Sequence, residues 1–251
     1  MGYTKSSNPV LSEKIFYASR NGSYSESETM TVNGTVNKVG LLLFFLVAAA
    51  SYTWGLFNDS MDSSVVLPWL IGGAIGGLIL AVVTAFKPVW SPYTAPFYAL
   101  AEGLMLGGLS AMMNSAYPGI VVQAVGLTFA TLFAMLFAYK TGFIKVTEKF
   151  KTGVIAATGG IFIFYMLNWI LGMFGFGLNI ANDSGLLSIG ISLFIVVIAA
   201  LNLVLDFDFI EKGAQSGAPK YMEWYGAFGL MVTLVWLYVE LLRLLSKLAK
   251  R

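Results

Sequence analysis

Long apolar runs separated by short polar breaks fill the chain from residue 39 onward. A membrane-spanning helix needs about 20 mostly apolar residues, because about 30 Å of hydrocarbon is crossed at 1.5 Å per residue. Backbone polar groups must be satisfied inside the lipid, and the alternating pattern of a barrel strand is absent, so the runs predict helices. We expect seven spans, at about residues 39–57, 65–86, 93–113, 119–139, 153–178, 185–205 and 223–245.

The segment before the first apolar run differs in composition from the rest of the chain. The first 38 residues are polar, rich in Ser, Asn and Gly, and lack the apolar stretch of a signal peptide. We therefore expect a polar N-terminal tail over residues 1–38, a transmembrane domain over 39–246 and a short basic tail over 247–251.

The overall composition supports a membrane protein and excludes several other classes. Apolar residues make up 57% of the chain and charged residues 11%, against about 45–50% and about 25% in soluble domains. A net charge of +2 offers no basic face for nucleic acid. Without Cys or His the chain cannot form disulfides, Cys-His or Ser-His-Asp catalytic sites, or histidine-ligated zinc sites. We expect no enzymatic activity and no resident cofactor, with membrane lipid as the surroundings.

The basic residues predict the orientation. With the N-terminus in the cytoplasm, most of the 15 Lys and Arg residues are cytoplasmic, and the three outside loops contain none. Four basic residues after or near the end of the last span conflict with this rule: Arg243, Lys247, Lys250 and Arg251. Either the last segment spans despite them, or it re-enters and both termini are cytoplasmic.

Glycines spaced four residues apart indicate close helix packing. Gly73 and Gly77 lie in the second predicted span, and Gly103 and Gly107 lie in the third. Small residues at this spacing let helix backbones approach each other in lipid. We interpret them as packing positions.

Acidic residues within or at the ends of the spans are the candidate functional groups, because charge at membrane depth is costly. Glu102 lies midway along the third span, and we expect it to face the bundle interior and not the lipid. The others are Asp206 and Asp208 at the end of the sixth span, and Glu223 and Glu240 near the two ends of the seventh.

Asp206 is the predicted control point. Glu223 starts the next span at the same membrane face and is its first candidate partner; Asp208 is the second, if the helix unwinds after Leu205. A cluster of carboxylates can bind Ca²⁺ through oxygen ligands, here at Asp206 and Glu223, or share a proton. The alternative for Asp208 is a solvated helix end, since it shares a helix face with Glu211 and Lys212.

Glu240 has a simpler interpretation. Arg243 follows it by three residues, or about one helical turn, so that a structural ion pair near the membrane interface explains both residues.

Three segments resemble the Bax inhibitor-1 family, in its bacterial YccA-like branch. The first runs from Glu102-Gly103 to Leu106-Gly107, the second from Val204-Leu205-Asp206 to Gly213, and the third from Leu237 to Leu245. The resemblance covers about residues 39–245, with the first 38 residues unmatched.

This resemblance implies a fold, a function and a location. The fold is a seven-transmembrane all-α bundle with the last helix central, and the function a pH-sensitive Ca²⁺ leak in the bacterial inner membrane. The resemblance also implies an alternative, a non-transporting regulator that binds another membrane protein such as a quality-control protease. In the family mechanism two aspartates share a proton: Asp206 matches the first position, whereas Thr233 stands at the second.

Overall fold

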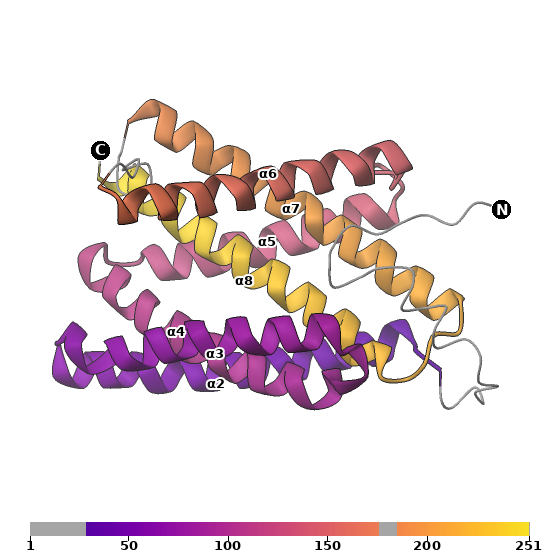
Figure 1. Cartoon of the computed structure of the whole chain (residues 1–251), viewed down its shortest axis with the longest axis horizontal. Helices are drawn as coiled ribbons and strands as arrows, with labels where there is room; N and C mark the ends of the chain where they lie inside the picture. Colours follow the sequence, from indigo (N-terminus) through magenta and orange to yellow (C-terminus); the bar gives the residue numbers. More distant parts are fainter. Residues whose placement is uncertain (1–28, 176–184, 251) are drawn as a thin grey trace. The chain divides into compact units, whose positions relative to one another are not determined.

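The structure, a computed structural model, describes residues 29–175 and 185–250. Within these residues the chain forms seven α-helices and one 3₁₀ turn, and the only β-type pairing is a single bridge (Figure 1). The elements are α2 (Val32–Ser60), α3 (Ser63–Phe86), η2 (Pro88–Trp90), α4 (Ser91–Ala116), α5 (Ile120–Lys140), α6 (Glu148–Met173), α7 (Leu186–Gln215) and α8 (Met222–Ala249). The predicted all-α class is confirmed.

Six of the helices in the described part of the chain are long and apolar enough to cross a membrane. The exception is α4, which has 26 residues and is therefore long enough. Its carboxylate at Glu102, its prolines and its several Ser and Gly residues lower its mean hydropathy. The chain is an integral, multi-pass membrane protein, and the prediction of seven spans is supported for six of them.

The helices α2 and α7 extend farthest beyond the predicted spans. α2 begins at Val32 with Thr31 as its N-cap, so the last residues of the predicted tail are helical. α7 continues past Leu205 as far as Gln215, and the suggestion that the helix unwinds after Leu205 is wrong. α6 ends at Met173, and the predicted end of that span at residue 178 lies outside the described residues.

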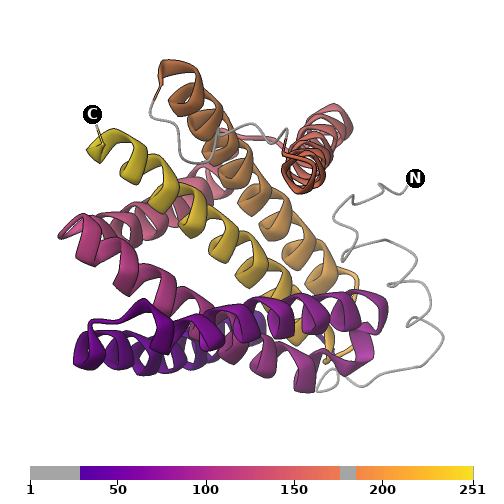
Figure 2. The ribbon, with the colours of Figure 1, turned by 60° about the vertical axis from the view of Figure 1, so that its left-hand side comes forward.

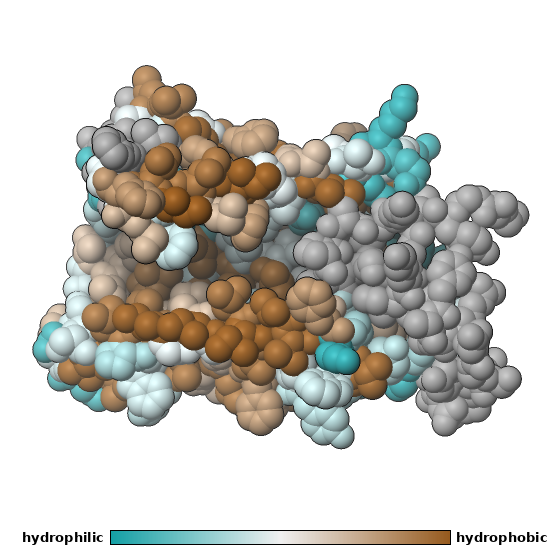
Figure 3. Space-filling view, viewed as in Figure 1, coloured by the Kyte–Doolittle hydropathy of each residue, from teal (hydrophilic) through white to brown (hydrophobic). Residues whose placement is uncertain are grey.

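The outward faces of the helices are apolar. Large hydrophobic side chains such as Phe44, Leu78, Phe133 and Phe162 are more than half exposed, and broad hydrophobic areas cover the face seen in Figure 3. Such an exposed apolar surface is far larger than soluble proteins tolerate. It is the surface expected to contact lipid.

The contacts divide the chain into two compact units. The first contains α2, α3 and α4 with the end of α7 and the start of α8, from Asp206 to Val232. The second contains α5 and α6 with the earlier part of α7 and the later part of α8. Both α7 and α8 are unbroken helices (Figures 1 and 2), so nothing in α8 indicates a re-entrant segment.

Glycines bring the helices of the first unit into close contact, as predicted. A Cβ atom on Gly73 of α3 would lie 2.5 Å from the backbone oxygen of Ala101 in α4. A Cβ on Gly103 of α4 would lie 2.3 Å from the oxygen of Leu46 in α2. α4 therefore packs backbone to backbone against both α2 and α3.

The second unit has its own apolar contacts. Ile161 of α6 packs with Ile195 and Ile198 of α7, and Trp236 of α8 covers this cluster. Asn202 donates a hydrogen bond of 2.9 Å to the Thr158 hydroxyl, which joins α7 to α6.

The last helix is more buried than the other spans. The apolar part of α8 is 67% buried, compared with at most 44% in the other five candidate spans. The central position of this helix stays a prediction.

Candidate functional site

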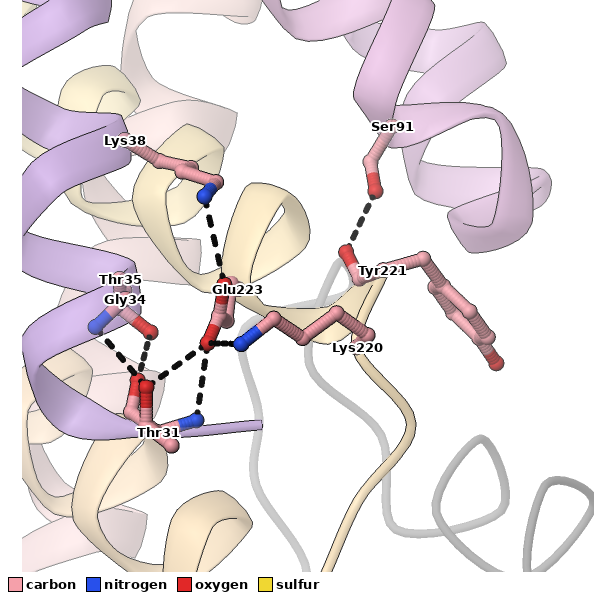
Figure 4. A network of polar contacts seen from close by, with 8 residues as sticks. All are labelled: Thr31, Gly34, Thr35, Lys38, Ser91, Lys220, Tyr221 and Glu223. Atoms are coloured by element: carbon pink, nitrogen blue, oxygen red, sulfur yellow. Dashed lines mark hydrogen bonds and ion pairs between the residues drawn. The ribbon is translucent and has the colours of Figure 1, made fainter. Parts of the chain in front are cut away.

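The most heavily bonded of the predicted acidic residues is Glu223, at the start of α8 (Figure 4). Its side chain is fully buried. The Oε1 atom accepts hydrogen bonds from the Thr31 backbone N–H (3.0 Å), the Thr31 hydroxyl (2.8 Å) and the Lys220 ammonium (2.8 Å). Its Oε2 atom lies 3.5 Å from the Lys38 Nζ. Two ammonium groups therefore compensate its charge.

The backbone of α2 shapes this site from the other side. Thr31 caps the helix, since its hydroxyl accepts the Gly34 N–H at 2.9 Å. The partial positive charge of a helix N-terminus favours an anion, and the Glu223 carboxylate lies there. A Cβ atom on Gly34 would lie only 1.9 Å from Glu223 Oε1, so the carboxylate fits because this residue is glycine.

The end of α7 places the lysine and the glutamate. Gly217 adopts a left-handed conformation (φ 67°), and the Ala218 N–H donates to the Gly213 carbonyl at 3.1 Å. This is the Schellman ending, which satisfies the last helical carbonyls with a glycine. Pro219 then turns the chain into α8, and Lys220 and Glu223 face each other across the first turn.

Glu102 lies inside the first unit. The predicted inward orientation is confirmed, because the residue is 8% exposed. Its carboxylate hydrogen-bonds with the hydroxyl of Tyr98, one turn earlier in α4, and lies against Gly77 of α3. Within the described ranges, its Oε2 atom has no hydrogen-bond partner. Tyr98 is held in turn by an edge-to-face contact of 5.0 Å with Phe228 of α8.

Asp206 and Asp208 are both buried in the continuous helix α7, with exposed fractions of 2% and 7%. The Lys212 Nζ lies 2.8 Å from Asp208 Oδ2, an i,i+4 pair of the kind that the helix spacing allows. Asp208 is therefore not a solvated helix-end residue, which corrects that alternative. With α7 helical throughout, Asp206 and Asp208 point to different sides of the helix.

Glu240 and Arg243 form an ion pair in the second unit, with 2.8 Å between Arg243 Nη1 and Glu240 Oε1. The Tyr165 hydroxyl of α6 donates to the same carboxylate oxygen at 3.0 Å and accepts a hydrogen bond from Arg243. Glu240 is 2% exposed, so its carboxylate is buried within the protein. It joins α8 to α6.

No group of three or more acidic residues that could hold a metal ion occurs within residues 29–175 and 185–250. Ca²⁺ takes six to eight oxygen ligands, whereas the Glu223 carboxylate already faces two ammonium groups. Its contacts are those of a structural anion. A Ca²⁺ site at Asp206 and Glu223 stays a prediction.

The sequence was also compared with families and with individual proteins. The sequence model of the Bax inhibitor 1 like family matches residues 8–250. The chain belongs to this family. The match includes most of the first 38 residues, so the expectation that this segment lies outside the resemblance is wrong. No curated protein and no solved structure matches the chain.

Thr233 is 5% exposed in α8. A threonine hydroxyl does not ionise in the physiological pH range. Thr233 therefore cannot share a proton with Asp206 as a second aspartate would.

Sequence reasoning missed the partners of the buried glutamates. Thr31, Lys38 and Lys220 surround Glu223, and Tyr165 completes the Glu240 pair. The threonine three residues before Gly34 was a visible N-cap signal. Lys220 lies three residues before Glu223, which is a local helix-spacing signal. Lys38 and Tyr165 carry no local signal, because their contacts depend on which helices become neighbours.

Lys247 is a second group that the sequence left unexplained. It is 2% exposed, and its ammonium donates to the hydroxyls of Ser188 and Ser192 of α7, both at 2.8 Å. Of the four basic residues that conflict with the predicted orientation, Arg243 and Lys247 are thus held within the second unit. Their charges are used in helix packing, which weakens their value as topology signals.

Proposed function

We propose that the protein is a pH-sensitive leak pathway for Ca²⁺ or other cations, in which protonation of buried carboxylates keeps the pathway closed. The observation that carries this proposal is Glu102. It is a buried carboxylate inside a bundle of membrane helices, and no ion pair to it occurs in the described part of the chain. Such a group is costly in a membrane and points to an ion or proton path. Family membership supports the same class of function.

Asp206 is the proposed control residue. It is 2% exposed, and it lies in α7 within the same unit as Glu102. A neutral carboxyl group is compatible with a tightly packed site inside the protein, whereas the ionised form gains by hydration. Loss of a proton from Asp206 would thus loosen the packing and admit cations. Glu223 and Asp208 have a different role in this proposal, because lysines compensate their charges.

Flux of radioactive Ca²⁺ into liposomes that contain the purified protein tests the proposal. Uptake is measured from acidic to mildly alkaline pH for the wild type and for Asp206→Asn and Glu102→Gln. We expect Asp206→Asn to remove most of the pH dependence, and Glu102→Gln to lower the flux at every pH. Glu148→Gln is the matched control, because that carboxylate is 58% exposed and should leave the profile unchanged.

Two results would overturn the proposal. A pH profile of Asp206→Asn identical to that of the wild type would exclude Asp206 as the control residue. Absence of flux in every sample, with correctly folded protein, would exclude a leak and favour a non-transporting regulator of another membrane protein.

A further inference from the structure

The residues just before α2 form a short strap across the turn between α7 and α8. Thr29 and Pro219 form an antiparallel bridge, and the Met30 N–H donates to the Ala218 carbonyl at 2.6 Å. These residues are almost 190 positions apart in the chain. The strap consists of residues 29–31 and fixes the start of α2 to the start of α8.

A buried side chain anchors the strap. Met30 is 2% exposed and packs into a cluster that includes Phe209 and Ile210 of α7 and Met222 and Tyr225 of α8. Burial of this side chain removes apolar surface from water and stabilises the closed strap. The strap therefore adds one apolar anchor to its backbone hydrogen bonds.

The second anchor is Glu223. The strap residue Thr31 donates both its N–H and its hydroxyl to this carboxylate (Figure 4). Lys38 and Lys220 hold the same carboxylate from two sides, with their own side chains 27% and 51% exposed. The anchor is thus a buried anion whose cationic partners reach solvent.

The cluster beneath the strap contains an unsatisfied polar group. Tyr225 is fully buried, and its hydroxyl has no hydrogen-bond partner within the described residues. A buried hydroxyl without a partner is destabilising, so the packing of this cluster is not fully satisfied.

We propose that residues 29–31 are a releasable strap that closes this end of the helix bundle, with Glu223 as its anchor, and that its opening permits cation flux. Opening of the strap disturbs α2 only at its first turn, which Thr31 caps, and leaves the later hydrogen bonds of that helix intact. Segments held by few buried contacts are the ones that open locally. The second part of this proposal, that opening of the strap permits cation flux, is called the flux clause below. It rests on the function proposed above.

A disulfide lock tests the flux clause, and the chain contains no native cysteine. Thr29→Cys with Pro219→Cys places two thiols on a bridged pair. Such pairs have Cα atoms about 4.5 Å apart, within the range of about 4.4–6.8 Å for disulfides. We expect oxidation to lower Ca²⁺ flux in liposomes several-fold and reduction to restore it. The single variant Thr29→Cys should not respond, and equal flux of the oxidised and reduced double variant would overturn the flux clause.

Hydrogen–deuterium exchange tests the strap without any transport. The Met30 and Thr31 amides should be protected in the wild type and should exchange at least about tenfold faster in Glu223→Ala and Gly34→Ala. Gly40→Ala in the same helix is the control, since a Cβ there meets nothing within 4 Å. Unchanged protection in both test variants would overturn the strap. Absence of flux in every liposome sample would overturn the proposed leak and the flux clause with it, while exchange would still decide whether the strap opens.

Discussion

The two ends of α8 each carry a buried glutamate, and the two are held in different ways. Glu223 is bound by a residue 192 positions away in the chain, by the backbone of that residue and by two lysines. Glu240 is bound by Arg243 on its own helix and by one tyrosine of a neighbouring helix. The first glutamate fastens the segment that precedes α2, and through Lys38 also α2 itself, whereas the second fastens only one helix to another.

This difference distinguishes a contact that holds two helices together from a contact that can open while the helices stay folded. The Tyr165–Glu240–Arg243 contact lies between two long helices, and breaking it requires their separation. The Thr31–Glu223 contact holds three residues that precede a helix. Because the unfolding of so short a segment exposes little apolar surface, this contact is the one that can open while the helices stay intact.

The largest effect is expected for Glu223→Ala. This change leaves the Thr31 N–H without its acceptor and two lysines without their anion. Loss of one partner of a buried charged network costs about 3–5 kcal/mol, and since both lysines reach solvent we expect about 2–3 kcal/mol. Thermal unfolding in detergent measures it. Lys220 is a half-exposed partner of Glu223, so Lys220→Ala should lower the free energy of unfolding by less than about 1 kcal/mol. Equal losses of stability in the Glu223→Ala and Lys220→Ala variants would contradict the anchoring role of Glu223.

The next effect concerns Gly34. Gly34→Ala would force a methyl group against the Glu223 carboxylate, where the Cβ to Oε1 distance would be 1.9 Å. Overpacking costs about 1–3 kcal/mol, although alanine is the better helix former. Gly40→Ala should be neutral or stabilising by less than about 1 kcal/mol. The same change in melting temperature for both variants would show that the carboxylate moves away freely.

At the other end of α8, Tyr165→Phe removes the hydroxyl shared by Glu240 and Arg243. We expect a loss of about 1 kcal/mol, the usual net value of a hydrogen bond to a partly buried group. A double-mutant cycle with Glu240→Gln checks the coupling. Exchange of the Met30 amide should not change in either variant. A faster exchange would show that the two ends of α8 are not independent.

The smallest effect is expected for an exposed carboxylate, which serves as the reference for the two buried ones. Asp62 caps α3, and its hydrogen bonds from the Ser64 hydroxyl (2.7 Å) and N–H (2.8 Å) hold its pKa below the usual value. A lowered pKa means that the cap stabilises the fold above the unfolded-state pKa, about 3.9, and that this contribution disappears as pH falls through the folded-state pKa. Asp62→Ala should lower the melting temperature slightly at neutral pH and not at strongly acidic pH. An equal decrease at both pH values would contradict the capping role.

Much of the fold could be predicted from the sequence. The apolar runs give the helices and the membrane class, because a chain segment in lipid has to satisfy its own backbone hydrogen bonds. The glycines at positions 73 and 103 pack as their spacing predicts. Lys212 reaches Asp208 because i,i+4 neighbours lie on one helix face. All of these features depend on residues close together in the chain.

The extent of α7 could not be predicted from apolar runs alone. Asp206 and Asp208 interrupt the hydropathy of the sequence, and yet the helix continues to Gln215. The pairing of Asp208 with Lys212 one turn later supports the continued helix. The signal that ends this helix is Gly217, whose left-handed conformation the sequence allows but does not require.

The sequence by itself thus determined where the helices lie, that they belong in a membrane and which acidic residues lie in or beside the apolar segments. Only the tertiary structure decided the partners that are distant in the chain, which are Thr31 and Lys38 for Glu223 and Tyr165 for Glu240. Helix periodicity is a local property and follows from neighbours three or four residues apart. The Thr31–Glu223 contact joins positions 192 residues apart, and so it exists only after the helices have packed together.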